Sequence, residues 1–223
     1  MKTTPIPPSI RTFDLPGPVG KLEALLNQGR EDAPYCALVC HPHPMGGGTM
    51  HNKVVYRTMK ALHGLGLPVL RFNFRGTGRS QGLHDSGRGE QEDVRAALNW
   101  LDREFHRPIL FAGFSFGANV GMRACCGDSR VHGLIALGLP IVAEGRRYDY
   151  GYLPACSQPK LFVSGDHDPC GHLADVEAVV ATAPDPKKLV WIQDADHFFV
   201  GKLDQVQAAI VSWAKHYFDI GNL

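Results

Sequence analysis

Short apolar runs alternate along this chain with segments in which apolar residues recur every three or four positions. The runs are typical of buried strands, and we expect strands at 35–41, 67–74, 108–114, 131–139, 160–165 and 187–192. The periodic segments predict helices at 54–66, 94–105, 116–126, 171–182 and 203–218. Strands that alternate with helices form a mostly parallel sheet covered on both faces, because each crossover helix packs against the sheet.

The chain is long enough to bury a sizeable core in one domain, which we expect to span residues 1–223. Residues 1–30 alternate less regularly, and we expect them to form antiparallel strands at the edge of the sheet. The predicted fold class is therefore α/β, with a mostly parallel, twisted sheet of about seven to eight strands and helices on both faces.

Composition and charge argue against several functional classes. The formal net charge is +1, so we expect no nucleic-acid partner and no binding to membranes. No apolar run reaches the roughly 18 residues of a membrane span, and the first residues, MKTTPIPPSIRTF, lack the apolar core of a secretory signal. We therefore expect a cytoplasmic protein whose six cysteines are reduced thiols.

Motifs for metals and nucleotide cofactors are weak. His41 and His43 form an HxH pair, but no CxxC motif or further ligand pair accompanies them. No G-K-[ST] follows the glycines at 46–48, and the glycines of RGTGRSQG (75–82) miss the dinucleotide spacing by one residue. We expect neither a metal nor an organic cofactor.

A cluster of charged residues between positions 71 and 93 contains both signs. Arg71, Arg75, Arg79 and Arg88 are offset by Asp85, Glu90, Glu92 and Asp93. This balance predicts a solvated loop and the start of a helix rather than a phosphate site.

The segment LFAGFSFGANVG (110–121) places a serine between a predicted strand and a predicted helix. Ser115 has Gly113 two positions before it and Gly117 two positions after it. A tight turn there forces a strained backbone, and larger side chains at either glycine would clash with it. This is the G-x-S-x-G nucleophile elbow in its expected strand–turn–helix context, with the hydroxyl raised at a helix N-terminus.

Two other strand exits carry acidic residues and a histidine. Asp166 and Asp168 follow the strand that ends near Gly165, and His197 follows the last predicted strand. The carboxyl ends of parallel strands meet at one edge of the sheet, where ligands bind. Serine, aspartate and histidine in this chain order are typical of α/β-hydrolases.

A fourth strand exit, CHPHPMGGGTMHNK (40–53), is a candidate for stabilising an oxyanion. Such a site needs two backbone N–H donors, and one is expected from Phe116, the residue after the nucleophile. Proline has no N–H, so within HPHPM the second donor is His43 or Met45. The glycines at 46–48 would let the backbone approach a substrate.

Taken together, these motifs resemble the α/β-hydrolase superfamily, in its small bacterial branch of lidless carboxylesterase-like or dienelactone-hydrolase-like proteins. The similar segments are HPHPMGGGTMHNKVV, FNFRGTGRSQG, GFSFGA, GDHDP and DHFF, which together span nearly the whole chain. The resemblance implies Ser115 as nucleophile, His197 as base and Asp168 as the acid. Dienelactone hydrolases usually carry cysteine at the elbow, so the serine argues against their lactone specificity.

The expected reaction is hydrolysis of a small-molecule ester through an acyl-enzyme, with His197 exchanging the proton and Asp168 orienting the imidazole. Asp168 lies three residues past Gly165, far enough to turn toward His197, whereas Asp166 is expected to cap the turn. Activity is expected to fall on the acid side near the ordinary histidine pKa of roughly 6–7.

The segment between the strands ending near Leu139 and beginning near Lys160 is too short for a cap domain. We expect an open site lined by Phe114, Phe198 and Phe199, and therefore a preference for short acyl chains. A thioesterase or small-peptide hydrolase with the same triad is the alternative, and a non-catalytic binding protein of this fold is a third. The oligomeric state is not predicted.

Overall fold

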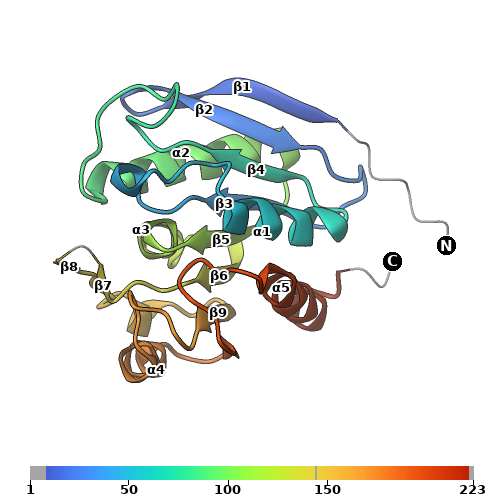
Figure 1. Cartoon of the computed structure of the whole chain (residues 1–223). Helices are drawn as coiled ribbons and strands as arrows, with labels where there is room; N and C mark the ends of the chain where they lie inside the picture. Colours follow the sequence, from blue (N-terminus) through green and yellow to red (C-terminus); the bar gives the residue numbers. More distant parts are fainter. Residues whose placement is uncertain (1–8, 144, 221–223) are drawn as a thin grey trace.

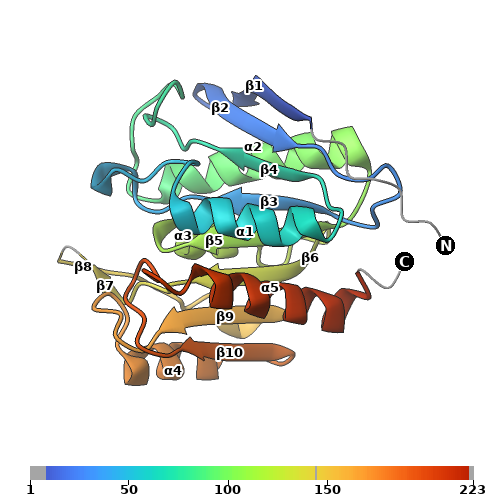
Figure 2. The same ribbon diagram turned by 45° about the vertical axis from the view of Figure 1, so that its right-hand side comes forward.

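An eight-stranded sheet forms the centre of the molecule, in the order β1-β2-β4-β3-β5-β6-β9-β10 (Figures 1 and 2). The structure, a computed structural model, describes residues 9–143 and 145–220. The segment MKTTPIPPSIRTF is predicted to lack a secretory signal, and its first eight residues lie outside the described range. The strands are β1 (Ile10–Gly17), β2 (Gly20–Asn27), β3 (Cys36–Cys40), β4 (Val69–Phe72), β5 (Ile109–Phe114), β6 (Val131–Leu137), β9 (Lys160–Gly165) and β10 (Lys187–Ile192).

The sheet is parallel from β4 to β10 and antiparallel at one edge. β1 pairs with β2, and β2 with β4, in antiparallel register, while the remaining neighbours are parallel. The predicted strands and the antiparallel edge are confirmed, with ends that differ by up to two residues. Strands β3, β5 and β9 are buried along their whole length, which explains why β3 and β5 are continuously apolar and β9 is largely so.

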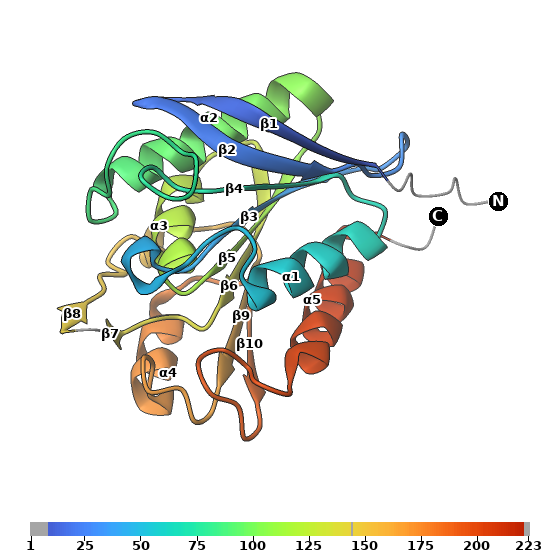
Figure 3. The ribbon, with the colours of Figure 1, turned by 45° about the horizontal axis from the view of Figure 1, so that its top comes forward.

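Helices cover both faces of the sheet (Figures 2 and 3). One face carries α1 (Lys53–Gly64) and α5 (Leu203–Phe218), and the other carries α2 (Arg88–Phe105), α3 (Phe116–Cys125) and α4 (Leu173–Thr182). The predicted helices are confirmed, although α2 begins six residues before the predicted start at residue 94. None of the described helices is long and apolar enough to cross a membrane.

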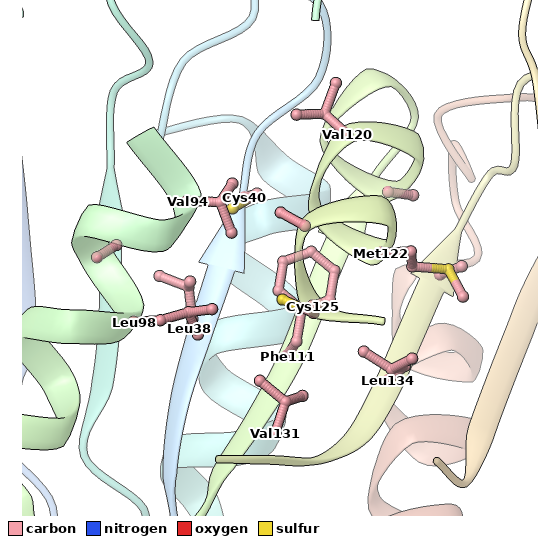
Figure 4. Close-up of a cluster of buried hydrophobic side chains, with 14 of the residues drawn as sticks. Leu38, Cys40, Val94, Leu98, Phe111, Val120, Met122, Cys125, Val131 and Leu134 are labelled. Carbon is pink, nitrogen blue, oxygen red and sulfur yellow. The ribbon is translucent and has the colours of Figure 1, made fainter. Parts of the chain in front are cut away.

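Helix α3 packs closely against the sheet where it carries Gly121. A Cβ on Gly121 would lie 2.0 Å from the ring of Phe111 on β5, so any side chain there would push the helix away. Phe111 is fully buried between α3 and the neighbouring strands (Figure 4). This close packing fixes the position of the turn that joins β5 to α3.

The chain between β6 and β9 forms a small excursion rather than a domain. It contains a hairpin of two-residue strands, β7 (Val142–Ala143) and β8 (Arg146–Arg147), and a 3₁₀ turn at Leu153–Ala155. The described residues of this segment therefore form no cap domain, as the length of the segment predicts.

The charged cluster between residues 71 and 93 is more deeply buried than the sequence predicts. Arg71, Arg75 and Asp93 are 3%, 6% and 0% exposed. The guanidinium of Arg75 lies 2.7 Å from a carboxylate oxygen of Asp93, whose oxygens also accept the Arg75 main-chain N–H. The prediction of a solvated loop is wrong for these residues: Arg75 and Asp93 form a buried ion pair, and Arg71 donates to the carbonyl of Met50 and to the side-chain oxygen of Asn27.

Candidate active site

The turn between β5 and α3 holds Ser115 in a conformation that few residues adopt. Its φ is 54° and its ψ is −120°, in the positive-φ region where a side chain is strained. A Cβ on Gly113 would lie 2.5 Å from the carbonyl oxygen of Gly117, and one on Gly117 would lie 2.4 Å from that of His41. The predicted steric need for both glycines is confirmed.

Three side chains from separate strand exits meet above this turn. The imidazole of His197, after β10, has its Nε2 2.9 Å from the hydroxyl oxygen of Ser115. Its Nδ1 lies 2.8 Å from Oδ2 of Asp168, after β9. With the imidazole neutral and protonated on Nδ1, Ser115 donates to His197 and His197 donates to Asp168. The three groups form one chain of hydrogen bonds from a buried carboxylate to a hydroxyl.

The two aspartates after β9 occupy different surroundings. Asp168 is 2% exposed, and its second oxygen accepts the N–H of Cys170 at 2.7 Å. Asp166 instead accepts the N–H of Ala195 at 3.2 Å and so joins the turns that follow β9 and β10. Asp168 is therefore the carboxylate beside His197.

The carboxylate changes the acidity of His197. Burial lowers the pKa of His197, but hydrogen bonds with Asp168 and Cys170 outweigh that effect and raise the pKa to about 9. This pKa is higher than the ordinary histidine value of roughly 6–7 that the sequence predicts. The sequence does not reveal how close the carboxylate of Asp168 lies to the imidazole. The imidazolium is thus well stabilised in this pocket, as proton transfer from a serine requires.

The loop after β3 is anchored by His41. The Nδ1–H of His41 donates to the carbonyl of Pro42, and its Nε2 accepts the N–H of Phe74. Burial lowers the pKa of His41 to about 4, so the ring stays neutral. Because both ring nitrogens are engaged, the HxH pair offers no ligand set for a metal, and His41 serves to position the loop. Its partner, Phe74, lies 33 residues away, so the HxH pattern alone could not show this role.

Backbone donors near Ser115 come from two elements. Phe116 is the first residue of α3, and a first-turn N–H has no acceptor within its own helix. The N–H of Met45 donates to Nδ1 of His43 at 3.1 Å within the 3₁₀ turn Pro44–Gly46. Of the two candidates left open by the sequence, Met45 already uses its donor inside the loop.

A cavity of about 450 Å³ opens over Ser115. Its wall includes Ser115, His197, His43, Cys170 and Phe198, together with the glycines at 46–48. Half of the surface of Phe198 is exposed. The cavity has the size of a small-ligand site.

Two of the three phenylalanines predicted to line this site lie elsewhere. Phe114 and Phe199 are 1% and 0% exposed and belong to the core between the sheet and the helices α1 and α5. The ring of Phe114 packs against His197, with the centroids 5.1 Å apart. Phe199 adopts a φ of 54°, and this turn separates it from the exposed Phe198. Phe114 therefore contacts the imidazole from the side of the core. Of the three phenylalanines, only Phe198 lines the cavity.

Asp168, Cys170 and His197 could each offer a ligand atom to a metal ion, since these atoms lie within 4.8 Å of one another. Asp168 and His197 already bond to each other through such atoms. A metal ion would have to break the hydrogen bond that orients the imidazole.

Comparison with known proteins agrees with the observed fold. Residues 36–215 match the family model described as an alpha/beta hydrolase domain. An uncharacterized protein of Rickettsia prowazekii, RP471, is 36% identical over 201 residues, which cover 87% of this chain and 84% of that protein.

Two solved structures are similar over almost their whole length. An alpha-beta serine hydrolase homologue from Coxiella burnetii is 38% identical, with a TM-score of 0.82, over 91% of this chain and 96% of that one. XC6422 from Xanthomonas campestris, described as a serine hydrolase without lid, is 32% identical, with a TM-score of 0.83, over 99% and 100%. These likenesses support hydrolase activity, and the chain belongs to the α/β-hydrolase family.

Proposed function

We propose that this protein is a serine hydrolase that cleaves small, short-acyl carboxylic esters through an acyl-enzyme. The observation that supports this most directly is the hydrogen-bond chain from Asp168 through His197 to Ser115, which ends at the wall of a cavity. A serine hydroxyl is a weak nucleophile unless a base removes its proton, and His197 lies within reach to do so.

In the first half of the reaction, the Ser115 oxygen attacks the ester carbonyl and its proton passes to Nε2 of His197. The tetrahedral intermediate then collapses, the bond to the alcohol oxygen breaks, and Nε2 returns the proton to the departing alcohol. In the second half, water attacks the acyl-serine in the same way, and the carboxylic acid leaves as the proton returns to Ser115. No group beyond ester and water is consumed.

Asp168 keeps the proton of the neutral imidazole on Nδ1, so that Nε2 faces Ser115 as an acceptor. The same carboxylate stabilises the imidazolium that forms, consistent with the raised pKa of His197. The oxyanion is held by the N–H of Phe116 at the start of α3 and by that of His43, since Met45 already donates within its loop.

The surroundings of the site favour short substrates. The cavity is about 450 Å³, and the excursion that borders it through Ala143 and Tyr148 is a hairpin rather than a cap. Each methylene that leaves the protein surface forfeits about 0.8 kcal/mol of burial. We therefore expect activity on p-nitrophenyl esters to peak at about two to six acyl carbons and to fall beyond them.

The proposal is tested by labelling and by kinetics on the same samples. A fluorophosphonate should label wild-type protein at Ser115, and Ser115→Ala should lower ester hydrolysis roughly 10⁴–10⁶-fold while the fold is retained. Ser129→Ala is the matched control, because Ser129 is exposed on the segment between α3 and β6, where β6 begins rather than ends.

Near wild-type hydrolysis by Ser115→Ala would refute the nucleophile, and a maximum at ten or more acyl carbons would refute the short-acyl class. Thioesters of the same acyl groups, measured in parallel, separate an esterase from a thioesterase.

A further inference from the structure

A second cavity, of about 320 Å³, adjoins the one over Ser115. The two cavities share His43 and Tyr148, and the second is also lined by Phe116, the residue after the nucleophile. Because Phe116 and His43 are the proposed oxyanion donors, a substrate bound at Ser115 can extend from the reacting carbonyl into this space. The second cavity thus borders the space in which a substrate at Ser115 would lie.

This second cavity is strongly cationic. Arg88 of α2, Arg123 of α3, and Arg146 and Arg147 of β8 all line it, against a single described carboxylate, Asp149. Four positive charges and one negative charge leave a formal charge of +3 among these residues. The whole chain carries only +1, so this concentration of positive charge is a local feature.

The four arginines differ in how far their charges are already neutralised. Arg123 lies 2.6 Å from Asp149, which forms an ion pair with it. Arg88 is 3.5 Å from Asp85, and its side chain is 84% exposed. Arg147 forms no ion pair with any described residue, and Arg146 contacts the imidazole of His43. At least Arg88 and Arg147 therefore have guanidinium donors available for another anion.

The start of α2 is not itself the anion site. The N–H groups of Gly87 and Gly89 at this helix terminus already donate to Glu90 and Asp85. Recognition must then come from the guanidinium groups, whose paired N–H donors match two oxygens of a carboxylate or of a phosphate.

Resting on the proposed function, we propose that this cavity binds an anionic group of the substrate, a carboxylate or a phosphate, and that the enzyme prefers esters bearing such a group. The anion would contact Arg88 and Arg147 while the ester carbonyl lies against Phe116 and His43. The substrate class is thereby narrowed to small esters with a negative charge beside the scissile bond, on the acyl or the alcohol side.

The test compares esters in which a second carboxyl group is either free and charged or methylated and neutral, and it measures only release of p-nitrophenol or of acetate. On the acyl side, p-nitrophenyl hydrogen glutarate is compared with its methyl ester, and on the alcohol side 3-acetoxypropanoate with its methyl ester. Values of kcat/KM are divided by the hydroxide-catalysed rate of each compound. The anionic member of at least one pair should be favoured about tenfold or more at low salt, and this preference should shrink as ionic strength rises.

Variants assign the preference to the cavity. Arg147→Gln and Arg88→Gln should each reduce the anionic-to-neutral ratio about three- to tenfold. Arg103→Gln removes an equal charge from the other end of α2, about 22 Å from Arg88, and should leave the ratio unchanged. Inorganic phosphate should inhibit wild-type hydrolysis competitively, and less so in Arg147→Gln.

The two proposals fail in different ways. If neutral esters are hydrolysed and Ser115 is labelled, yet neither pair favours the anion, the anion site is refuted and the esterase proposal stands. The anion site is also refuted if the preference survives in both Arg147→Gln and Arg88→Gln. If Ser115 is not labelled and no ester is hydrolysed, the esterase proposal is refuted, and the proposal of an anion site for the substrate is refuted as well.

Discussion

Two buried carboxylates lie in similar surroundings in this molecule but have different partners. Asp93 on α2 and Asp168 after β9 are 0% and 2% exposed, and each accepts a main-chain N–H. Asp93 is paired with the guanidinium of Arg75, which is itself buried. Among the described residues, this guanidinium donates hydrogen bonds to Asp93 alone. Asp168 is paired with His197, whose second nitrogen lies 2.9 Å from Ser115.

Burial and a basic partner therefore do not by themselves identify a catalytic carboxylate. Arg75 keeps its charge at every accessible pH, so its pair with Asp93 fixes the loop after β4 against α2. An imidazole can take up and release a proton, and that of His197 lies 2.9 Å from a hydroxyl that faces a cavity. We expect the first carboxylate to govern stability and the second to govern activity.

The largest expected effect separates the two carboxylates by activity. Asp168→Asn should lower kcat by about 10³–10⁴-fold, because the amide no longer holds the imidazole proton on Nδ1 or stabilises the imidazolium. The free energy of unfolding should change far less. Steady-state kinetics and guanidinium denaturation on one preparation check both, and full activity in the folded variant would contradict the role of Asp168.

The second prediction concerns stability. Asp93→Ala should lower the free energy of unfolding by about 3–5 kcal/mol, because it leaves the buried charge of Arg75 without a partner. Replacing both residues, as Arg75→Met with Asp93→Leu, should recover part of the loss. Denaturant titration measures all three proteins, and kcat per folded molecule should stay near wild type. A large loss of kcat in well-folded Asp93→Ala would contradict the expectation that Asp93 affects stability and not activity.

The third prediction uses the acidity of His197. The base must be neutral, so kcat/KM should fall as the pH drops below its pKa, by up to tenfold per unit. Hydrogen bonds with Asp168 and Cys170 raise that pKa to about 9 against the opposing effect of burial. The acid limb of the profile should therefore lie above the ordinary histidine value, and in Asp168→Asn it should move to lower pH. A wild-type limb at or below pH 6 would contradict this electrostatic effect.

The elements of the fold were predictable because they depend on local patterns. The continuous apolar sequences of β3 and β5 and the apolar stripe of α5 are visible within a few residues of the chain. The hairpin of β7 and β8 was not predicted, since its strands have two residues each and carry no periodic signal.

The site was predictable in its residue types but less so in its surroundings. Ser115, Asp168 and His197 follow from turn chemistry and chain order, and the structure brings these three together. The burial of Arg75 depends on Asp93, 18 residues away, and could not be deduced from a local excess of charge. The burial of Phe199 beside the exposed Phe198 depends on a positive φ at Phe199, and a phenylalanine in the sequence does not indicate such a backbone conformation.

The smallest expected effect concerns the neighbouring aspartate. Asp166 accepts the N–H of Ala195 at 3.2 Å and makes no contact with His197 that would affect its proton. Asp166→Asn keeps an oxygen acceptor at this position, so kcat/KM should stay within about threefold of wild type and the free energy of unfolding within about 1 kcal/mol. Asp166→Ala removes the acceptor and should cost about 1 kcal/mol of stability. The same p-nitrophenyl ester assay ranks both variants against Asp168→Asn. Asp168 is bonded to Nδ1 of His197, and a group in that position selects the tautomer of the imidazole. A loss of kcat in Asp166→Asn as large as that in Asp168→Asn would therefore contradict the assignment of Asp168 as the carboxylate that orients His197.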